Sequence, residues 1–185
     1  AKVGESYGAK IIQRPPELVD PNTKTEDVIS HAHELITKEH TKEFTYYVLL
    51  LANGGFINSL ILDQAIEKIE KKPEFDSCVG AVSADMFTPV RAKKITSDDE
   101  IVPFMDLDIF GKITSNRDSA GGVFFIDLSL AVIRPYCFDT MDGTPPFFWL
   151  GKKIMPFKKD FGGDLDATWQ YPVLESWLKD NSSKG

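Results

Sequence analysis

The 185-residue sequence has few cysteines and no long apolar run, and each absence narrows the class of protein. Cys78 and Cys137 are its two cysteines, too few for the disulfide framework of a small secreted domain. No apolar stretch approaches the roughly 20 residues that cross a bilayer, and no basic and apolar leader is seen at the start. We therefore expect a cytoplasmic protein without a membrane partner, in which both thiols are buried structural groups.

An excess of positive charge is also missing. The sequence has 21 Lys and Arg against 28 Asp and Glu, which gives a net charge of -7. Because a nucleic-acid backbone binds to clustered cations, this charge argues against nucleic acid as the main partner. A small anionic ligand is still compatible with a few cations in one cleft. Hydrophobic residues make up 42%, an ordinary globular value. This length predicts a single domain over residues 1–185.

Helical and extended patterns alternate between glycine and proline breaks. Apolar residues at helical spacing predict helices over 25–38 and 62–69 and a terminal helix with Pro172 in its first turn. Extended runs predict strands at 44–51, 77–83, 121–126 and 151–157, a hairpin from 91–95 and 101–104, and a short helical stretch at 128–134. The aliphatic run 44–51 is typical of a central strand. The alternation favours a mostly parallel α/β sheet with ligands at the carboxyl ends of its strands.

Two Asp-Leu-Asp triplets are candidates for a metal site. Asp164 and Asp166 follow a predicted strand and precede a predicted helix, which is where such folds bind ligands. At a turn the two carboxylates can converge on a divalent cation, but the local sequence favours Asp166 as the N-cap of the terminal helix. Asp106 and Asp108 follow no strand end and are predicted to lie in a surface loop.

The histidines and the single Arg and Lys residues indicate a binding site less clearly than the Asp-Leu-Asp triplets do. His31 and His33 lie two residues apart on a predicted helix, so they face different directions and cannot form an i, i+4 metal pair. Arg14, Arg91 and Lys93 could each bind phosphate or carboxylate, but isolated cations are common on protein surfaces.

Several segments, taken in order along the chain, resemble the acylneuraminate (sialic acid) cytidylyltransferases. They are Tyr7-Gly8-Ala9, Arg14-Pro15-Pro16-Glu17-Leu18, Thr25-Glu26-Asp27, Val48-Leu49-Leu50, Arg91-Ala92-Lys93-Lys94-Ile95, Gly122-Val123-Phe124-Phe125 and Asp164-Leu165-Asp166. The set spans nearly the whole chain. Three family features differ: the basic triphosphate loop before the first matched segment has no counterpart, Leu51 to Phe56 replace L-Q-P-T-S-P-L, and Gln170 replaces a later aspartate.

The resemblance implies a Rossmann-like nucleotidyltransferase (GT-A-like) three-layer fold with a mostly parallel sheet and a small hairpin or dimerisation extension. It implies that CTP and a nonulosonic sugar acid react to a CMP-sugar and pyrophosphate, with Mg²⁺ as cofactor and a homodimer as the assembly. The implied roles are metal binding for Asp164 and Asp166, catalysis for these two with Arg14, nucleotide binding for Arg14, Thr25, Asp27 and Asn53, and substrate binding for Arg91, Lys93 and Arg117.

Alternatives stay open at this stage. The D-x-D could serve a nucleotide-sugar-dependent glycosyltransferase, or the chain could be a non-catalytic binding or assembly module of the same fold. Arg117 could instead pair with Asp118. The apolar stretch from Pro145 to Trp149 fits a dimer interface and a packed core equally well.

Overall fold

The computed structural model describes residues 2–40, 42–116 and 121–181. The chain forms two compact units: the first contains residues 1–47, 74–77 and 133–154, and the second contains residues 48–73, 78–132 and 155–185. The prediction of a single domain over residues 1–185 stays a prediction. None of the described helices has the length and apolar character needed to span a membrane.

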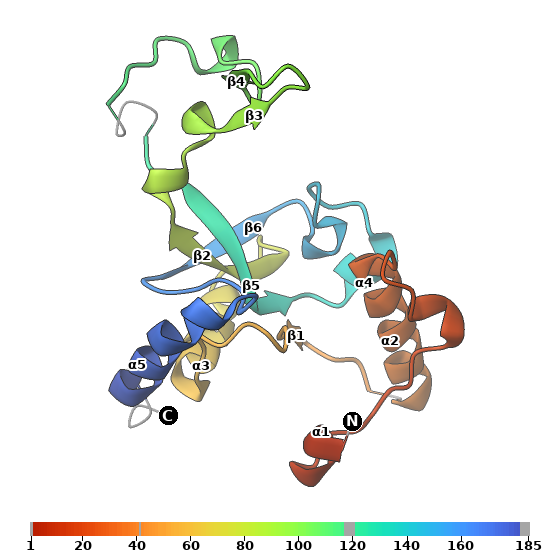
Figure 1. The fold of residues 1–185 in the computed structure, drawn as a ribbon. Helices are drawn as coiled ribbons and strands as arrows, with labels where there is room; N and C mark the ends of the chain where they lie inside the picture. The colour runs from red at the N-terminus through yellow and green to blue at the C-terminus, as the bar shows by residue number, and fades with distance from the viewer. Residues whose placement is uncertain (1, 41, 117–120, 182–185) are drawn as a thin grey trace. The chain divides into compact units, whose positions relative to one another are not determined.

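A four-stranded sheet forms the centre of the second unit, with strand order β1-β5-β2-β6 (Figure 1). Its strands are β1 (Tyr47–Leu49), β5 (Phe124–Ile133), β2 (Ser77–Ser83) and β6 (Ile154–Lys159). Between β2 and β5 the chain leaves this sheet and forms a hairpin of β3 (Lys93–Ile95) and β4 (Ile101–Pro103). Because Ile95 pairs with Ile101 in an antiparallel register, the predicted hairpin is confirmed.

Two expectations about the sheet are wrong. The run 44–51 forms only the short β1, which stands at an end of the strand order, and Val48 and Leu50 are 38% and 48% exposed. The apolar run indicates a strand but not its number of neighbours. The two inner strands are β5 and β2, and β5 includes the stretch 128–133 that was expected to be helical. Leu130 and Val132 are fully buried there, and periodicity does not distinguish such a run from a buried helix.

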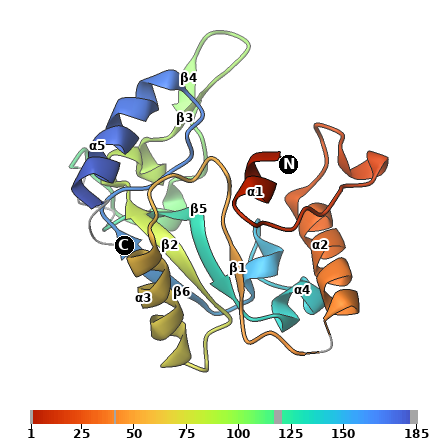
Figure 2. The same cartoon turned by 90° about the horizontal axis from the view of Figure 1, so that it is seen from below.

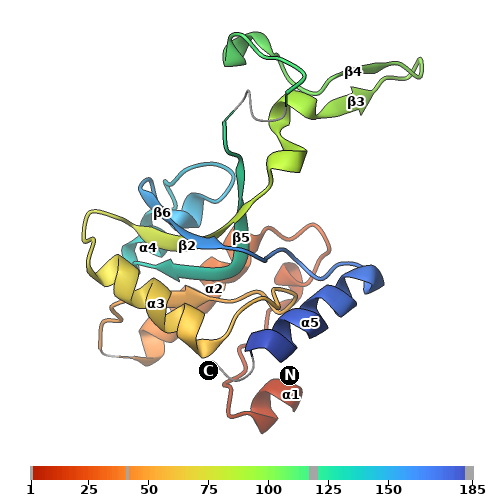
Figure 3. The ribbon, with the colours of Figure 1, turned by 90° about the vertical axis from the view of Figure 1, so that its left-hand side faces the viewer.

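Two predicted helices of the second unit are confirmed, α3 (Ser59–Glu70) and α5 (Tyr171–Asn181), and Figure 3 shows both below the sheet strands. Asn58 caps α3, because its side chain accepts a hydrogen bond of 2.9 Å from the backbone N–H of Ile61. Ala65 and Ile69 of α3 are fully buried, and Phe56 packs edge-on against Trp177 of α5. Apolar packing therefore secures these helices.

The first unit contains α1 (Lys2–Ser6), α2 (Thr25–Glu39) and α4 (Tyr136–Thr140), and α2 and α4 lie side by side (Figure 2). The predicted helix over 25–38 is confirmed by α2. Trp149 is 1% exposed and belongs to the core of this unit, whereas Pro145, Pro146 and Phe148 are exposed, so the stretch is not wholly core. Burial raises the pKa of Cys137 in this unit to about 12 and that of Cys78 in the other unit to about 11, as expected for structural thiols.

Asp76 holds several segments of the first unit together. Its carboxylate accepts hydrogen bonds from the backbone N–H groups of Lys152 and Lys153, at 2.7 and 2.8 Å, and from the hydroxyl of Tyr136. Burial and the neighbouring Asp76 raise the pKa of Tyr136 to about 12. The neutral tyrosine therefore stabilises this unit.

Tyr136→Phe is expected to lower the free energy of unfolding at pH 7 by roughly 1 kcal/mol, because a hydrogen bond to Asp76 is lost. Since the folded-state pKa lies above the ordinary value near 10, the contribution is complete below pH 10 and is lost as the pH rises towards about 12. Urea unfolding at pH 7 and pH 11 measures this, with Tyr7→Phe as the exposed control. An equal difference at both pH values would contradict the assignment.

Candidate active site at the aspartate loop

Two loops of the second unit meet to form the site. An isolated bridge pairs Gly54 with Asp164, and the backbone N–H of Leu165 donates to the carbonyl of Asn53 at 2.9 Å. The side-chain amide of Asn53 donates to Asp166 Oδ1 at 3.3 Å. A Cβ on Gly54 would lie 2.5 Å from the Cβ of Ser129, so glycine allows this loop to pack against β5. The structure thus brings together three predicted site residues, Asn53, Asp164 and Asp166.

Gln170 holds the aspartate loop, which we define as residues 161–167. Its Oε1 accepts hydrogen bonds from the backbone N–H groups of Asp166 and Ala167, at 2.7 and 2.6 Å, and its Nε2 donates to the carbonyl of Asp164 at 2.8 Å. The N-cap of the short helix that precedes α5 is Ala167. The interpretation of Asp166 as the helix cap is therefore wrong, and its carboxylate faces Asn53.

Asp164 lies in a negatively charged environment. Its partial burial, followed by the charges of Asp166 and Asp127, raises the pKa of the Asp164 carboxyl above its usual value. Like charges at short range raise the energy of the ionised form, and a bound cation removes that repulsion. The arrangement is therefore suited to a cation, and Asp166 is exposed to receive one.

Below the aspartate loop lies a buried ion pair that the sequence analysis missed. Lys159 Nζ is 2.7 Å from Asp127 Oδ2, with side chains 4% and 2% exposed. Ser129 joins them, because its hydroxyl donates to Asp127 Oδ2 at 2.8 Å and lies 2.7 Å from Lys159 Nζ. Burial would raise the pKa of Asp127, but the hydrogen bond and charge of Lys159 outweigh it and hold this pKa below the usual value. Asp127 is therefore ionised in the folded protein near neutral pH.

A cavity of about 320 Å³ adjoins the aspartate loop. Its walls are residues 82–85 and Phe87, at the end of β2 and in the turn that follows, and residues 125–127 of β5. Gly162 and Gly163 complete it. Its volume is at the lower end of the range of small-molecule sites. A ligand in this cavity would lie beside the aspartate loop.

The other predicted site residues lie apart from these loops in the sequence. Arg14, Thr25 and Asp27 belong to the first unit, where all three are exposed and the last two stand in the first turn of α2. In the second unit, Lys93 is exposed in β3 and Arg91 donates to the carbonyl of Ser115 at 3.2 Å.

The last two predictions concern Arg117 and the second Asp-Leu-Asp triplet. Arg117, with its possible partner Asp118, lies outside the described residues. Asp106 and Asp108 are exposed, and the backbone N–H of Asp108 donates to Asp106 Oδ1 at 2.9 Å. The predicted surface position is confirmed for both, although Asp108 begins a short 3-10 helix over Asp108–Phe110.

A second polar cluster was also missed, in the first unit. The side chain of His33 is 12% exposed, and its Nε2 is 2.9 Å from Asp139 Oδ1. Its Nδ1 is 3.2 Å from the hydroxyl of Tyr47. A cavity of about 460 Å³ adjoins these side chains. The isolated histidine carried no spacing signal, because its partners are 14 and 106 residues away in sequence.

Within the described ranges, no group of three or more His, Cys, Asp or Glu side chains is arranged to hold a metal ion. A metal at the aspartate loop would therefore need further oxygen ligands from a substrate or water. Mg²⁺ commonly binds in this way, with one or two carboxylates and the phosphate oxygens of a nucleotide. The two aspartates fit that mode.

No model of a known protein family matches the sequence, and no curated protein does. A solved structure described as CMP:2-keto-3-deoxy-manno-octonic acid synthetase complexed with CTP is similar in fold, with a TM-score of 0.57. The sequences are 11% identical, and the match covers 97% of this chain and 76% of that chain. This likeness shows that the chain shares a mixed α/β fold with that structure.

Proposed function

We propose that this chain is a Mg²⁺-dependent cytidylyltransferase that joins CTP to a sialic-acid-like sugar acid and releases pyrophosphate. The observation that carries the proposal is the joining of the aspartate loop to the loop of Asn53, on a fold similar to that of a CMP-sugar-acid synthetase bound to CTP. The order of the motifs resembling the acylneuraminate cytidylyltransferases supports it. The Rossmann-like (GT-A-like) three-layer assignment belongs to the same proposal.

Asp164 and Asp166 would bind Mg²⁺ together with phosphate oxygens of the nucleotide. When bound, the ion supplies positive charge that offsets the charge of the phosphates. Asn53 orients Asp166 through its amide, and Gln170 fixes the backbone between the two aspartates. The sugar would lie in the cavity beside Gly162 and Gly163, where its hydroxyl can approach the α-phosphate.

The remaining predicted residues keep their roles as part of this proposal. Arg14, Thr25 and Asp27 are proposed to contact the nucleotide, and Arg91, Lys93 and Arg117 to bind the sugar acid. A guanidinium and an ammonium group suit the carboxylate of such a substrate. The cytoplasmic location stays a prediction.

Pyrophosphate release tests the proposed reaction. The protein with Mg²⁺ and CTP should release pyrophosphate only when a nonulosonic acid is added, and a panel of such acids identifies the substrate. A nucleotide-sugar-dependent glycosyltransferase would instead consume a preformed CMP-sugar and release no pyrophosphate. A non-catalytic module would bind CTP or the sugar acid without turnover. Either result would reject the proposed reaction.

We also propose that the protein is a homodimer joined through the hairpin. The cross-strand neighbours Ile95 and Ile101 are 71% and 72% exposed, and Phe104, which directly follows β4, is 64% exposed. Apolar side chains gathered on an exposed hairpin commonly mark an interface, and a second copy brings the same surface for mutual burial.

Replacing Ile95 and Ile101 with lysine is expected to convert the dimer to a monomer in sedimentation velocity experiments, because like charges replace the shared apolar surface. Lys94→Glu is the matched control, since alternation along β3 directs its side chain to the other face of the hairpin. If the Ile95→Lys, Ile101→Lys variant sediments as a dimer, the interface lies elsewhere.

A further inference from the structure

We infer that the buried pair of Lys159 and Asp127 positions the aspartate loop for metal and nucleotide. The inference rests on the proposed function where it treats the aspartate loop as a metal site. Whether the buried pair holds the loop in place can be tested without that assumption. Neither residue belongs to a motif that suggested the function. Both are positioning residues, since the proposed metal ligands are Asp164 and Asp166, whereas Lys159 and Asp127 are buried and Asp127 borders the cavity from its wall.

The two oxygens of the Asp127 carboxylate contact different groups. Oδ2 is bound by Lys159 Nζ at 2.7 Å and by the Ser129 hydroxyl at 2.8 Å. Oδ1 accepts a hydrogen bond from the backbone N–H of Ser129 at 3.1 Å and from that of Gly163 at 3.3 Å. One oxygen is thus anchored inside the unit, and the other holds the residue directly before Asp164.

Gly162 makes this contact sterically possible. A Cβ on Gly162 would lie 2.3 Å from Asp127 Oδ2 and 2.5 Å from a methyl carbon of Val82. Real Cβ atoms do not approach other atoms so closely, so the chain can pass over the carboxylate only with glycine at this position. The Gly-Gly pair before the triplet therefore fits the loop to the buried carboxylate.

The positive charge of Lys159 explains why a carboxylate can occupy this place. Asp127 is 4% exposed, and a buried charge without a partner is strongly unfavourable. Lys159 offsets the charge of Asp127 from within the unit, at 2.7 Å from its Oδ2 atom.

Paired substitutions separate the hydrogen bond from the charge. Asp127→Asn with Lys159→Met removes both charges but keeps the Oδ1 acceptor for Gly163, and the amide group of the introduced asparagine can donate to Ser129. Asp127→Leu with Lys159→Met removes the same charges and also the acceptor. Replacing a buried ion pair by residues of similar volume is often neutral for stability, so both variants are expected to fold.

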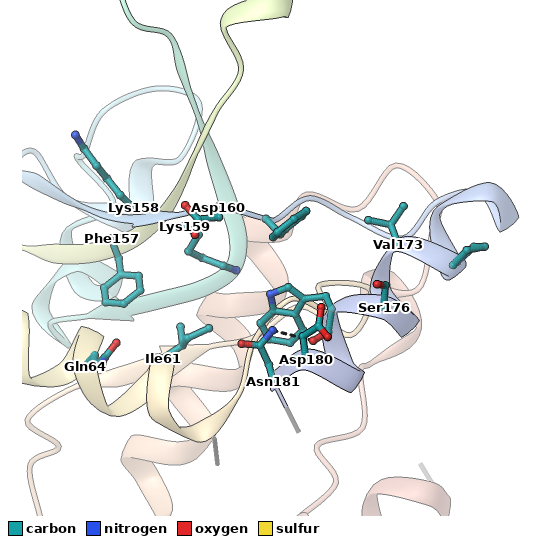
Figure 4. Close-up of a pocket in the computed structure, with 13 residues that line it drawn as sticks. Ile61, Gln64, Phe157, Lys158, Lys159, Asp160, Val173, Ser176, Asp180 and Asn181 are labelled. Atoms are coloured by element: carbon teal, nitrogen blue, oxygen red, sulfur yellow. Dashed lines mark hydrogen bonds between the residues drawn. The ribbon is translucent and has the colours of Figure 1, made fainter. Parts of the chain in front are cut away.

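Lys158→Met is the matched control for the loss of a lysine from β6. Lys158 is exposed, lies near the ring of Phe124, and points away from Lys159 in Figure 4. It should behave like the wild type in every measurement below.

The first readout is amide hydrogen exchange of residues 162–166 in the metal-free protein, and the second is Mn²⁺ affinity. For the leucine variant, exchange is expected to be at least about tenfold faster and Mn²⁺ binding about 10- to 100-fold weaker, as for other groups that orient metal ligands. The asparagine variant should stay within about threefold of the wild type. The KM for CTP should also rise more in the leucine variant than in the asparagine variant.

The inference would be overturned if the leucine variant exchanged its amide hydrogens and bound Mn²⁺ as the wild type does. If the leucine variant does not fold, the single variant Lys159→Met is compared with the double variant Lys159→Met, Asp127→Asn. The inference then requires slow exchange in the double variant and fast exchange in the single one. Equally fast exchange in both would overturn it. If the wild type itself binds no Mn²⁺ and shows no turnover, the proposed function fails, while the exchange data still decide the positioning role.

Discussion

Replacing Asp164 and Asp166 together with asparagine is expected to lower CTP turnover at saturating sugar acid by about 10²- to 10³-fold, the loss typical of removing a key electrostatic contact to the transition state. Each asparagine keeps the size of the aspartate but loses the negative charge that the proposed Mg²⁺ requires. The fold should be kept, because the loop is held by backbone contacts from Gly54 and the Gln170 side chain. Steady-state kinetics and thermal unfolding together measure both effects.

The protein contains its own control for this change. Asp106 and Asp108 form the same Asp-Leu-Asp triplet, but they are exposed and the Asp106 carboxylate accepts a hydrogen bond from the backbone N–H of Asp108. Asp106→Asn with Asp108→Asn should leave turnover unchanged. Wild-type activity after the change at Asp164 and Asp166 would show that these carboxylates serve only the structure of the loop. Equal losses for both triplets would contradict a site specific to the aspartate loop.

Lys159→Met is expected to lower the free energy of unfolding by about 3–5 kcal/mol, the usual cost of removing one member of a buried ion pair. The methionine fills a similar volume, so the loss comes mainly from the unpaired Asp127 carboxylate, which remains buried with Ser129 as its neighbour. Urea-induced unfolding monitored by circular dichroism measures it. Lys158→Met, on the exposed side of the same strand, should change stability by less than about 0.5 kcal/mol.

A loss below about 1 kcal/mol for Lys159→Met would mean that water or local rearrangement replaces the ammonium group. The buried pair would then contribute little to the fold. Such a result would also remove the basis for assigning Lys159 a positioning role.

Much of the fold could be predicted from local patterns. Helices α2, α3 and α5 showed apolar residues at helical spacing, and the hairpin of β3 and β4 had turn residues between two short extended runs. These signals are local, and packing agreed with them. The strand β5 was missed in its second half because a run buried on both faces has no alternation to distinguish it from a buried helix.

The same error hid the buried ion pair. Asp127 lies within β5, where the expected change from strand to helix made a single aspartate look like a boundary residue. Had the strand been extended, a lone aspartate and a serine two residues later on the same face would have required a buried partner. Lys159 could not be assigned that role, because the pairing of β2 with both β5 and β6 is a property of topology and not of spacing.

The loop site could be predicted in part. Position between a strand and a helix selected Asp164 and Asp166 over Asp106 and Asp108, and the structure places the first pair beside Asn53. The choice between cap and ligand needed the start of the short helix at Ala167 and the position of Gln170, which fixes the backbone of Asp166 and Ala167. Side-chain contacts of this kind depend on a turn geometry that the sequence does not specify.

The central claim is that the sugar acid attacks the α-phosphate of CTP, and transfer of label from CTP tests it most directly. With CTP labelled at the α-phosphate, Mg²⁺ and the sugar acid identified by pyrophosphate release, we predict that the label appears in a CMP-sugar and that the released pyrophosphate is unlabelled. Label in free CMP or pyrophosphate, or label that remains entirely in CTP while the protein is folded, would contradict the account.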